Sequence, residues 1–175
     1  MKFENVVFPD SVGFHCKKCG RCCQEQPADI NAEEQQQIEA KGFKDFLGEI
    51  DGIESIRSIR KKKGGGCFFL TENNECMIYD IRPATCRLQP FDITDWDYER
   101  NIIEVDLPPE SDCKGVFEGD TLPTEDIGRA AQTIVQDLLE ATAKTLGLPI
   151  TDKRVLSTTR ILVMGMIDQV RRISR

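Results

Sequence analysis

A run of four cysteines near the start of the chain constrains its fold more than any other feature. The residues are Cys16, Cys19, Cys22 and Cys23, in the spacing C-x2-C-x2-C-C. Two-residue gaps in a tight loop place thiols on one side, where they can converge on a metal, and Gly20 allows the loop to bend with a positive φ. The spacer positions carry lysine and arginine, which favour the thiolate form that binds metal. The run therefore predicts a metal site.

Cys22 and Cys23 are not expected to be equivalent ligands. In an extended backbone, neighbouring side chains point to opposite sides. We therefore expect Cys16, Cys19 and Cys22 to be three ligands of one site, with a fourth from later in the chain. Cys23 then serves a second site, supports the first without binding it, or remains a reactive thiol.

Four further cysteines are dispersed along the middle of the chain. They are Cys67, Cys76, Cys86 and Cys113. With the first four, they can supply two zinc sites of four thiolates each or two four-thiolate clusters. They can equally supply one complete cluster, with the other thiols structural or redox-active. The sequence leaves the number of sites open.

The spacing of the run favours iron–sulfur chemistry over zinc. Zinc fingers and ribbons have two separate CxxC or HxxxH pairs, whereas this chain has one tandem run and no second CxxC. C-x2-C-x2-C opens the bacterial ferredoxin run, although here the next cysteine follows immediately. We therefore expect an iron–sulfur cluster, of the 4Fe–4S type, with zinc as the alternative.

Composition limits the compartment and the partners. The 175 residues are 39% hydrophobic and 30% charged, with a net charge of −7 that argues against nucleic-acid binding. The longest apolar stretch, 161–167, is far shorter than the roughly 18 residues of a membrane span. The first residues lack the pattern of a signal peptide. We expect a cytoplasmic protein with reduced thiols and with neither nucleic acid nor membrane as partner.

These features predict an α+β fold: a small, irregular cysteine domain organised by metal, with a C-terminal helical hairpin. The cysteine domain covers 1–119 and includes a charged helical insert at about 31–63. Asn31 and Glu34 predict a capping box at the start of the insert helix. Short strands are expected within 53–63, in a hairpin of 64–70 with 76–79, and at 101–107. Asp80 is expected to cap a short helix.

Residues 120–175 predict two antiparallel helices. Thr124 is expected to cap the first, which 147–149 closes, and the second runs from about Asp152. Their apolar stripes are expected to pack against the cysteine domain. The alternative is a surface for an unidentified protein redox or docking partner, or for a second copy of the chain in a homodimer.

Several stretches carry a family resemblance. FHCKKCGRCC (14–23), GGCFFL (65–70), CMIYDIRPATCRLQPF (76–91) and CKG (113–115) resemble the YkgJ-type cysteine-cluster family, a zinc- or iron-chelating CxxCxxCC domain often labelled Fe–S-cluster-containing. The resemblance covers about 13–117, with all eight cysteines in order, and implies metal or cluster binding. A similar cysteine domain occurs in flagellin lysine methylases, which are longer proteins.

Outside the cysteines, Arg82 and Arg87 are the main candidates near a site. Either guanidinium could donate hydrogen bonds to cluster sulfur or an anionic ligand and so tune a reduction potential. The alternative is that both pair with nearby carboxylates or carbonyls. His15 is expected to be a surface or packing residue and a minor candidate ligand. The basic run at 60–63 is expected to form a solvated loop.

Three hypotheses for function follow. The first is a metal-binding protein, carrying an iron–sulfur cluster, in electron transfer, redox sensing or metal handling. The second is a zinc-stabilised module for protein interaction. The third is a cluster-dependent enzyme resembling protein lysine N-methylases.

Overall fold

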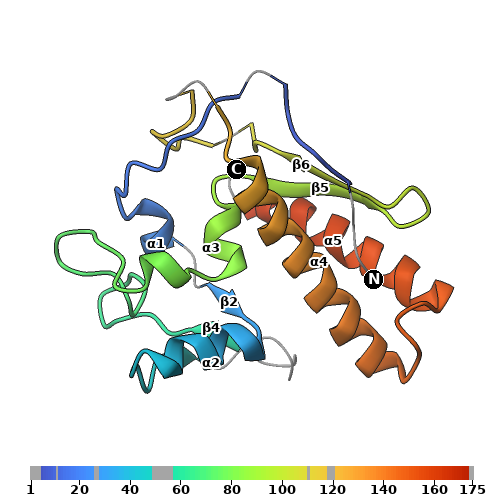
Figure 1. The fold of residues 1–175 in the computed structure, drawn as a ribbon, viewed down its shortest axis with the longest axis horizontal. Helices are drawn as coiled ribbons and strands as arrows, with labels where there is room; N and C mark the ends of the chain where they lie inside the picture. Colours follow the sequence, from blue (N-terminus) through green and yellow to red (C-terminus); the bar gives the residue numbers. More distant parts are fainter. Residues whose placement is uncertain are drawn as a thin grey trace. The chain divides into compact units, whose positions relative to one another are not determined.

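A computed structural model describes residues 5–10, 12–25, 28–48, 57–109, 111–117 and 121–173, with side chains described up to 164 except at 25. The chain divides into two compact units (Figure 1). Cys16–Arg87 forms the first, which we call the cysteine unit. Met1–His15 and Leu88–Arg175 form the second, the sheet–helix unit. Both contain helices and a small sheet, which confirms the α+β class. The predicted domains, 1–119 and 120–175, stay a prediction.

The sheet–helix unit is built on three strands in the order β1–β6–β5. β5 (Asp92–Asp97) and β6 (Ile102–Asp106) form an antiparallel hairpin, and β1 (Asn5–Val7) runs parallel to β6. The side chains of Trp96 and Ile103 are fully buried. β6 confirms the strand expected at 101–107.

Two long helices follow the sheet, as expected (Figure 1). α4 (Thr124–Leu146) is followed by Gly147 at the C-cap position, which adopts a left-handed conformation with φ of 64°. α5 (Lys153–Ile173) contacts α4 and β5, where Arg160 pairs with Asp95 through two hydrogen bonds of 2.9 and 3.2 Å.

Two features of the helical hairpin were not predicted: the residue at the N-cap of α4 and the exposed apolar residues of α5. Pro123, and not Thr124, occupies the N-cap position of α4. On α5, Ile161, Leu162 and Met164 are exposed, so its apolar residues are not all used inside the unit. The expected docking or dimer surface stays a prediction. No helix within the described residues is both long enough and apolar enough to cross a membrane.

A short pairing in the sheet–helix unit joins the segment before Cys16 to the segment after Cys113. Phe14 forms an isolated antiparallel bridge with Val116, and the His15 amide donates to the Gly115 carbonyl at 3.0 Å. This pairing anchors the backbone immediately before the cysteine run.

The cysteine unit contains a second three-stranded sheet and several short helices. The strands β2 (Asp29–Ile30), β4 (Arg57–Ile59) and β3 (Leu47–Gly48) are antiparallel in that order. β4 lies within the strand expected at 53–63, of which 53–56 fall outside the described residues. The helices are α1 (Arg21–Glu25), α2 (Ala32–Ala40), the 3-10 helix η1 (Tyr79–Ile81) and α3 (Ala84–Leu88).

The capping box predicted for α2 is confirmed. The Asn31 side chain accepts a hydrogen bond from the Glu34 amide at 2.9 Å, and the Glu34 carboxylate accepts one from the Asn31 amide at 3.2 Å. The cap expected from Asp80 is wrong. Asp80 lies inside η1, where it pairs with Lys41, and α3 starts at Ala84 because Pro83 fixes the preceding backbone.

The hairpin expected from 64–70 and 76–79 is reduced to one β-bridge and a turn. Leu70 and Cys76 make one antiparallel bridge around a turn in which the Thr71 amide donates to the Glu75 carbonyl at 2.8 Å. The flanking segments form turns instead of strands. Gly64, Gly65 and Gly66 all have positive φ, which interrupts a strand on one side.

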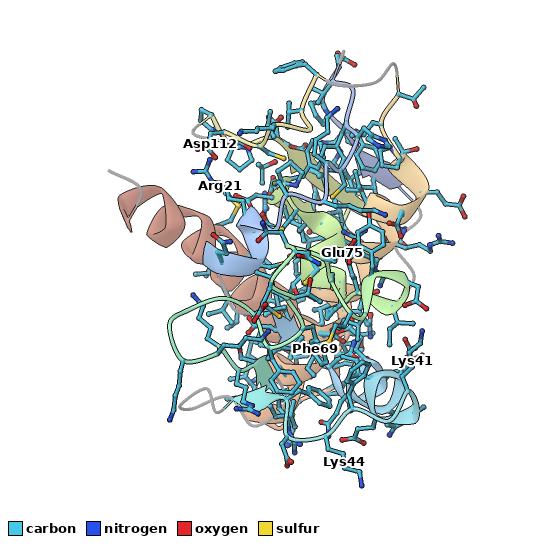
Figure 2. The ribbon with its side chains drawn as sticks, turned by 90° about the vertical axis from the view of Figure 1, so that its left-hand side faces the viewer. Arg21, Lys41, Lys44, Phe69, Glu75 and Asp112 are labelled. Carbon is cyan, nitrogen blue, oxygen red and sulfur yellow. The ribbon has the colours of Figure 1, made fainter. Side chains whose placement is uncertain are left out.

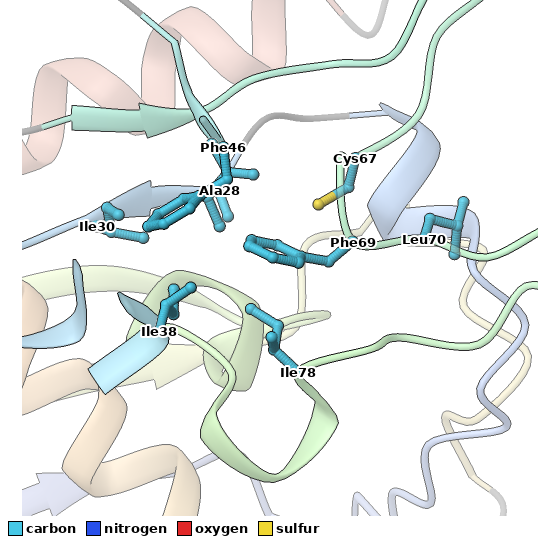
Figure 3. Close-up of a cluster of buried hydrophobic side chains, with 9 residues drawn as sticks. Ala28, Ile30, Ile38, Phe46, Cys67, Phe69, Leu70 and Ile78 are labelled. Carbon is cyan, nitrogen blue, oxygen red and sulfur yellow. The ribbon is translucent and has the colours of Figure 1, made fainter. Parts of the chain in front are cut away.

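A hydrophobic core holds the cysteine unit together, and a cysteine is part of it (Figure 3). Its members are Ala28, Ile30, Ile38, Phe46, Ile59, Cys67, Phe69, Leu70 and Ile78. Cys23, Cys76 and Cys86 are partly buried and pack against it. Several core residues come from the charged insert, so the insert is part of this core and not an appendage.

We predict opposite effects for two glycine substitutions in the sheet–helix unit. A Cβ at Gly115 would collide with the His15 carbonyl oxygen, so Gly115→Ala should lower the free energy of unfolding by about 1–3 kcal/mol. A Cβ at Gly128, inside α4, would make ordinary contacts with Phe8 and Val6 at 3.5–3.8 Å. Gly128→Ala should therefore raise stability by about 0.5–1 kcal/mol through helix propensity. Denaturant titration of both variants measures the difference, and a stable Gly115→Ala protein would contradict the close approach.

Candidate metal centre

Five cysteines of the cysteine unit form one electrostatically coupled group. They are Cys22, Cys23, Cys67, Cys76 and Cys86, which we call the five-thiol group. A negative charge on one of these thiols raises the pKa of others in the group. The structure thus brings together half of the cysteine run and three of the dispersed cysteines.

Helix α1 places Cys22 and Cys23 together, and not on opposite sides of an extended strand as the sequence prediction assumed. The Cys23 thiol donates a hydrogen bond to the Cys22 sulfur, which lowers the Cys22 pKa to about 6, with a smaller contribution from Arg82. The same hydrogen bond, together with burial, raises the pKa of Cys23. The two neighbours therefore differ in pKa, because one serves as hydrogen-bond donor and the other as acceptor. Their expected inequality as metal ligands stays a prediction.

The other three thiols of the group lie in or against the hydrophobic core: Cys67 belongs to it, and Cys76 and Cys86 pack against it. Burial is the largest cause of a raised pKa at each of them, and the pKa of Cys86 reaches about 12. The Cys67 amide donates to the Cys23 carbonyl at 2.7 Å, which fixes the dispersed group against α1. Figure 3 shows the Cys67 sulfur directed toward the core residues Phe46 and Phe69.

Two cations act on the thiols of this group. Arg82 lowers the pKa of Cys22, and it opposes the raised pKa values of Cys76 and Cys86. Lys62 acts in the same direction on Cys67. Positive charge near sulfur stabilises thiolates, which are the form that binds metal.

The Tyr79 ring fixes the position of Arg82. The guanidinium carbon lies 4.0 Å from the ring centroid, and the Arg82 Nε donates to the Tyr79 carbonyl at 3.2 Å. Lys18, from the cysteine run, lies 4.6 Å from the same centroid. Tyr79 was missed as a site residue in the sequence analysis, although it belongs to the quoted stretch 76–91. Arg87, the other arginine candidate, is half-buried in α3 beside Cys86.

The remaining predicted site residues belong to other segments of the chain. Cys16 and Cys19 belong to the loop before α1, where Cys19 is exposed, and Cys113 belongs to the sheet–helix unit. Within the described residues these three take no part in the five-thiol group. His15 is exposed. All eight cysteines stay predicted ligands.

Glu34 positions the helix that carries Cys86. One carboxylate oxygen caps α2, and the other accepts a hydrogen bond from the Ala84 amide at 2.7 Å, at the start of α3. A second hydrogen bond holds α3: the Thr85 hydroxyl donates to the Asp29 carbonyl at 2.9 Å. The Glu34 side chain is buried, so these bonds are shielded from water. The sequence indicates only the capping of α2 by Glu34, because Ala84 is fifty residues away.

The donor set of the group suits soft metals. Thiolates bind zinc and iron–sulfur clusters, whereas magnesium and calcium require oxygen ligands. Within the described part of the chain, no three Cys, His, Asp or Glu side chains are grouped closely enough to hold a metal ion. The chemistry and the number of thiols fit such a group, and its binding would require the sulfurs to draw closer.

Comparisons with known proteins agree with this chemistry. The family model CxxCxxCC, described as "Putative zinc- or iron-chelating domain", matches residues 15–106, a range that includes seven of the eight cysteines. An uncharacterized protein of Methanocaldococcus jannaschii is 25% identical over 154 residues, which cover 79% of this chain and 76% of that protein. No solved structure matches the chain.

We predict that Glu34→Ala will destabilise the cysteine unit. The substitution leaves the Asn31 and Ala84 amides without their acceptor, at a cost of about 2–4 kcal/mol. Denaturant unfolding and hydrogen exchange at the Ala84 amide measure the effect. Glu33→Ala is the matched control, since Glu33 is an exposed first-turn neighbour whose loss should change stability by at most about 0.5 kcal/mol. Equal effects of the two variants would refute the role of Glu34.

We also predict a pH-dependent difference in thiol reactivity within α1. With metal removed by chelator and reductant present, Cys22 should be alkylated by iodoacetamide at a rate that rises through about pH 6, because its pKa is near 6 and the thiolate is the nucleophile. Cys23 should stay unmodified over the same range, since its pKa is raised. Peptide mass spectrometry resolves the residues, and equal rates for both at pH 7 would contradict the hydrogen-bonded pair.

Proposed function

Because this chain belongs to the CxxCxxCC family of zinc- or iron-chelating domains, we propose that its metal group is an iron–sulfur cluster used for one-electron transfer. The observation that supports the proposal is the five-thiol group, an all-sulfur donor set gathered in one unit. A bound cluster would supply a one-electron redox centre, which the side chains of this protein cannot provide by themselves.

A neighbouring positive charge, and not the number of thiols, favours a cluster over a single zinc ion. A structural zinc ion takes four ligands, and a 4Fe–4S cluster also takes four thiolates. Four of the five thiols would suffice for either group. An iron–sulfur cluster gains a negative charge when it is reduced, so a neighbouring positive charge stabilises its reduced form. Arg82, held over the Tyr79 ring, would supply that positive charge.

We assign the ligands to Cys22, Cys67, Cys76 and Cys86. Cys22 is the member whose pKa is lowered, so it reaches the thiolate form most readily. Cys23 would remain a protonated neighbour that donates to the Cys22 sulfur. Hydrogen bonds to ligand sulfur tune reduction potentials, so Cys23 would act on the potential without binding iron. Cys22 is also exposed, which brings the group to the surface of the unit.

Anaerobic purification followed by analysis for iron, acid-labile sulfide and zinc tests the proposal. We expect a coloured protein with iron and sulfide in equal amounts. A colourless protein with stoichiometric zinc and no sulfide would refute the cluster and favour a zinc-stabilised module.

Serine variants test the ligand assignment separately. Cys76→Ser should lose most of its metal and should unfold more easily, because metal-binding energy is folding energy in such domains. Cys113→Ser is the matched control and should keep its metal, since Cys113 lies outside the cysteine unit. Cys19→Ser decides between two assignments: retention of metal supports the five-thiol group, whereas loss in Cys19→Ser with retention in Cys76→Ser would restore the set of Cys16, Cys19 and Cys22.

A further inference from the structure

The net negative charge of the chain is confined to one of its units. The cysteine unit contains twelve lysines and arginines and twelve aspartates and glutamates, so it is neutral overall. The other unit has eleven basic and eighteen acidic residues and therefore carries the entire charge of −7. The net charge of the whole chain therefore does not describe the charge of the surface around the thiols.

Within the cysteine unit, basic residues are concentrated in two stretches. Residues 16–24 and 55–71 contain no aspartate or glutamate. Eight basic side chains of these stretches are exposed. Six of them form what we call the basic face: Lys17, Lys18, Arg21, Lys61, Lys62 and Lys63.

Hydrogen bonds bring the two stretches together. The Lys61 ammonium donates to the Gln24 carbonyl at 3.2 Å, and the Cys67 amide donates to the Cys23 carbonyl at 2.7 Å. Gly20 lies so close to Leu70 and Asn74 that a Cβ there would approach them to 3.0–3.1 Å. Figure 1 shows α1 beside the loop that leads from β4 to η1. The basic residues therefore share one region of the unit.

The five-thiol group lies in the same region. Cys22 and Cys23 belong to the first stretch and Cys67 to the second, and Lys62 acts electrostatically on Cys67. The acidic residues on the adjoining turn are Glu72 and Glu75, both exposed, against six cations. The excess of positive charge therefore lies in the same region as the thiols.

We propose that the basic face docks the acidic surface of a one-electron carrier protein. The inference rests on the proposed function, since the carrier would be oxidised by one electron as the metal group is reduced by one, with no bond made or broken. Charge complementarity selects this partner, because a basic surface attracts an acidic one from a distance and orients it during encounter. A neutral unit with one limited basic region fits a protein partner with one acidic patch better than a long polyanion, whose binding requires an extended basic surface.

Binding of a reduced plant-type ferredoxin, an acidic one-electron carrier, to the full-length holoprotein tests the proposal. We expect the Kd to weaken at least about tenfold between about 50 and about 300 mM NaCl, because salt screens the attraction. The double variant Lys61→Gln/Lys63→Gln should weaken the low-salt Kd by about fivefold and reduce the salt dependence. Its iron and sulfide content should stay unchanged, which shows that the site itself is intact.

The control removes the same charge from elsewhere in the unit. Lys41→Gln/Lys44→Gln changes two exposed lysines that lie far from Arg21, as Figure 2 shows, and should leave the Kd within about twofold. Equal weakening by both double variants would overturn the proposal, because net charge alone would then explain the binding. Absence of ferredoxin binding at low salt, or tighter binding of a single-stranded DNA oligonucleotide, would also overturn it.

The binding measurement does not require an iron–sulfur cluster, so the two proposals fail separately. A protein with zinc and no sulfide that still binds ferredoxin through Lys61 and Lys63 would reject electron exchange and keep the docking surface. A protein with iron and sulfide that binds no ferredoxin would keep the cluster and reject the acidic partner.

Discussion

The buried carboxylate of Glu34 is the interaction on which the geometry of the cysteine unit depends. It closes the N-terminus of α2 and the N-terminus of α3 with its two oxygens, and α3 carries Cys86. Backbone amides at a helix start need acceptors, and a buried acceptor with two oxygens can satisfy two helices at once. Without it, the start of the helix that bears Cys86 would lose its hydrogen bond to the insert, and the Thr85 bond to the Asp29 carbonyl would remain.

The insert at about 31–63 contributes to both the core and the helix capping of the cysteine unit. On composition it is a charged helical addition between two cysteine-containing stretches. In the structure it supplies Ile38, Phe46 and Ile59 to the core against which the thiols pack, and it supplies the cap of α3. Metal chemistry and hydrophobic packing therefore share one small unit, in which a change in either affects the other.

The sequence predicted the parts of this protein that depend on local signals. The capping box at Asn31, the end of α4 before Gly147 and the strand at 102–106 all follow from residues a few positions apart. The metal chemistry also followed, because the spacing of the cysteine run is itself a local pattern, and the family model agrees with it.

What the sequence could not predict is set by contacts between distant residues. The five-residue helix α1 is too short to show a periodic pattern, so Cys22 and Cys23 were treated as extended. The bond from Glu34 to Ala84 spans fifty residues and leaves no trace in either neighbourhood. The positions of Lys18 and Arg82 over Tyr79 depend in the same way on how the loops meet.

The double role of Cys67 has a consequence for damage by oxidants. Its side chain is a member of the hydrophobic core and of the thiol group at the same time. Oxidation to a sulfinic or sulfonic acid would place a charged oxyacid among Phe69, Leu70 and Ile78, and the cell has no general means of reversing it. A molecule injured in this way would lose its packing together with its ligand. Oxidative injury at this position would then be visible to proteases as an unfolded unit, and the damaged protein would be removed instead of persisting as an intact but inactive one.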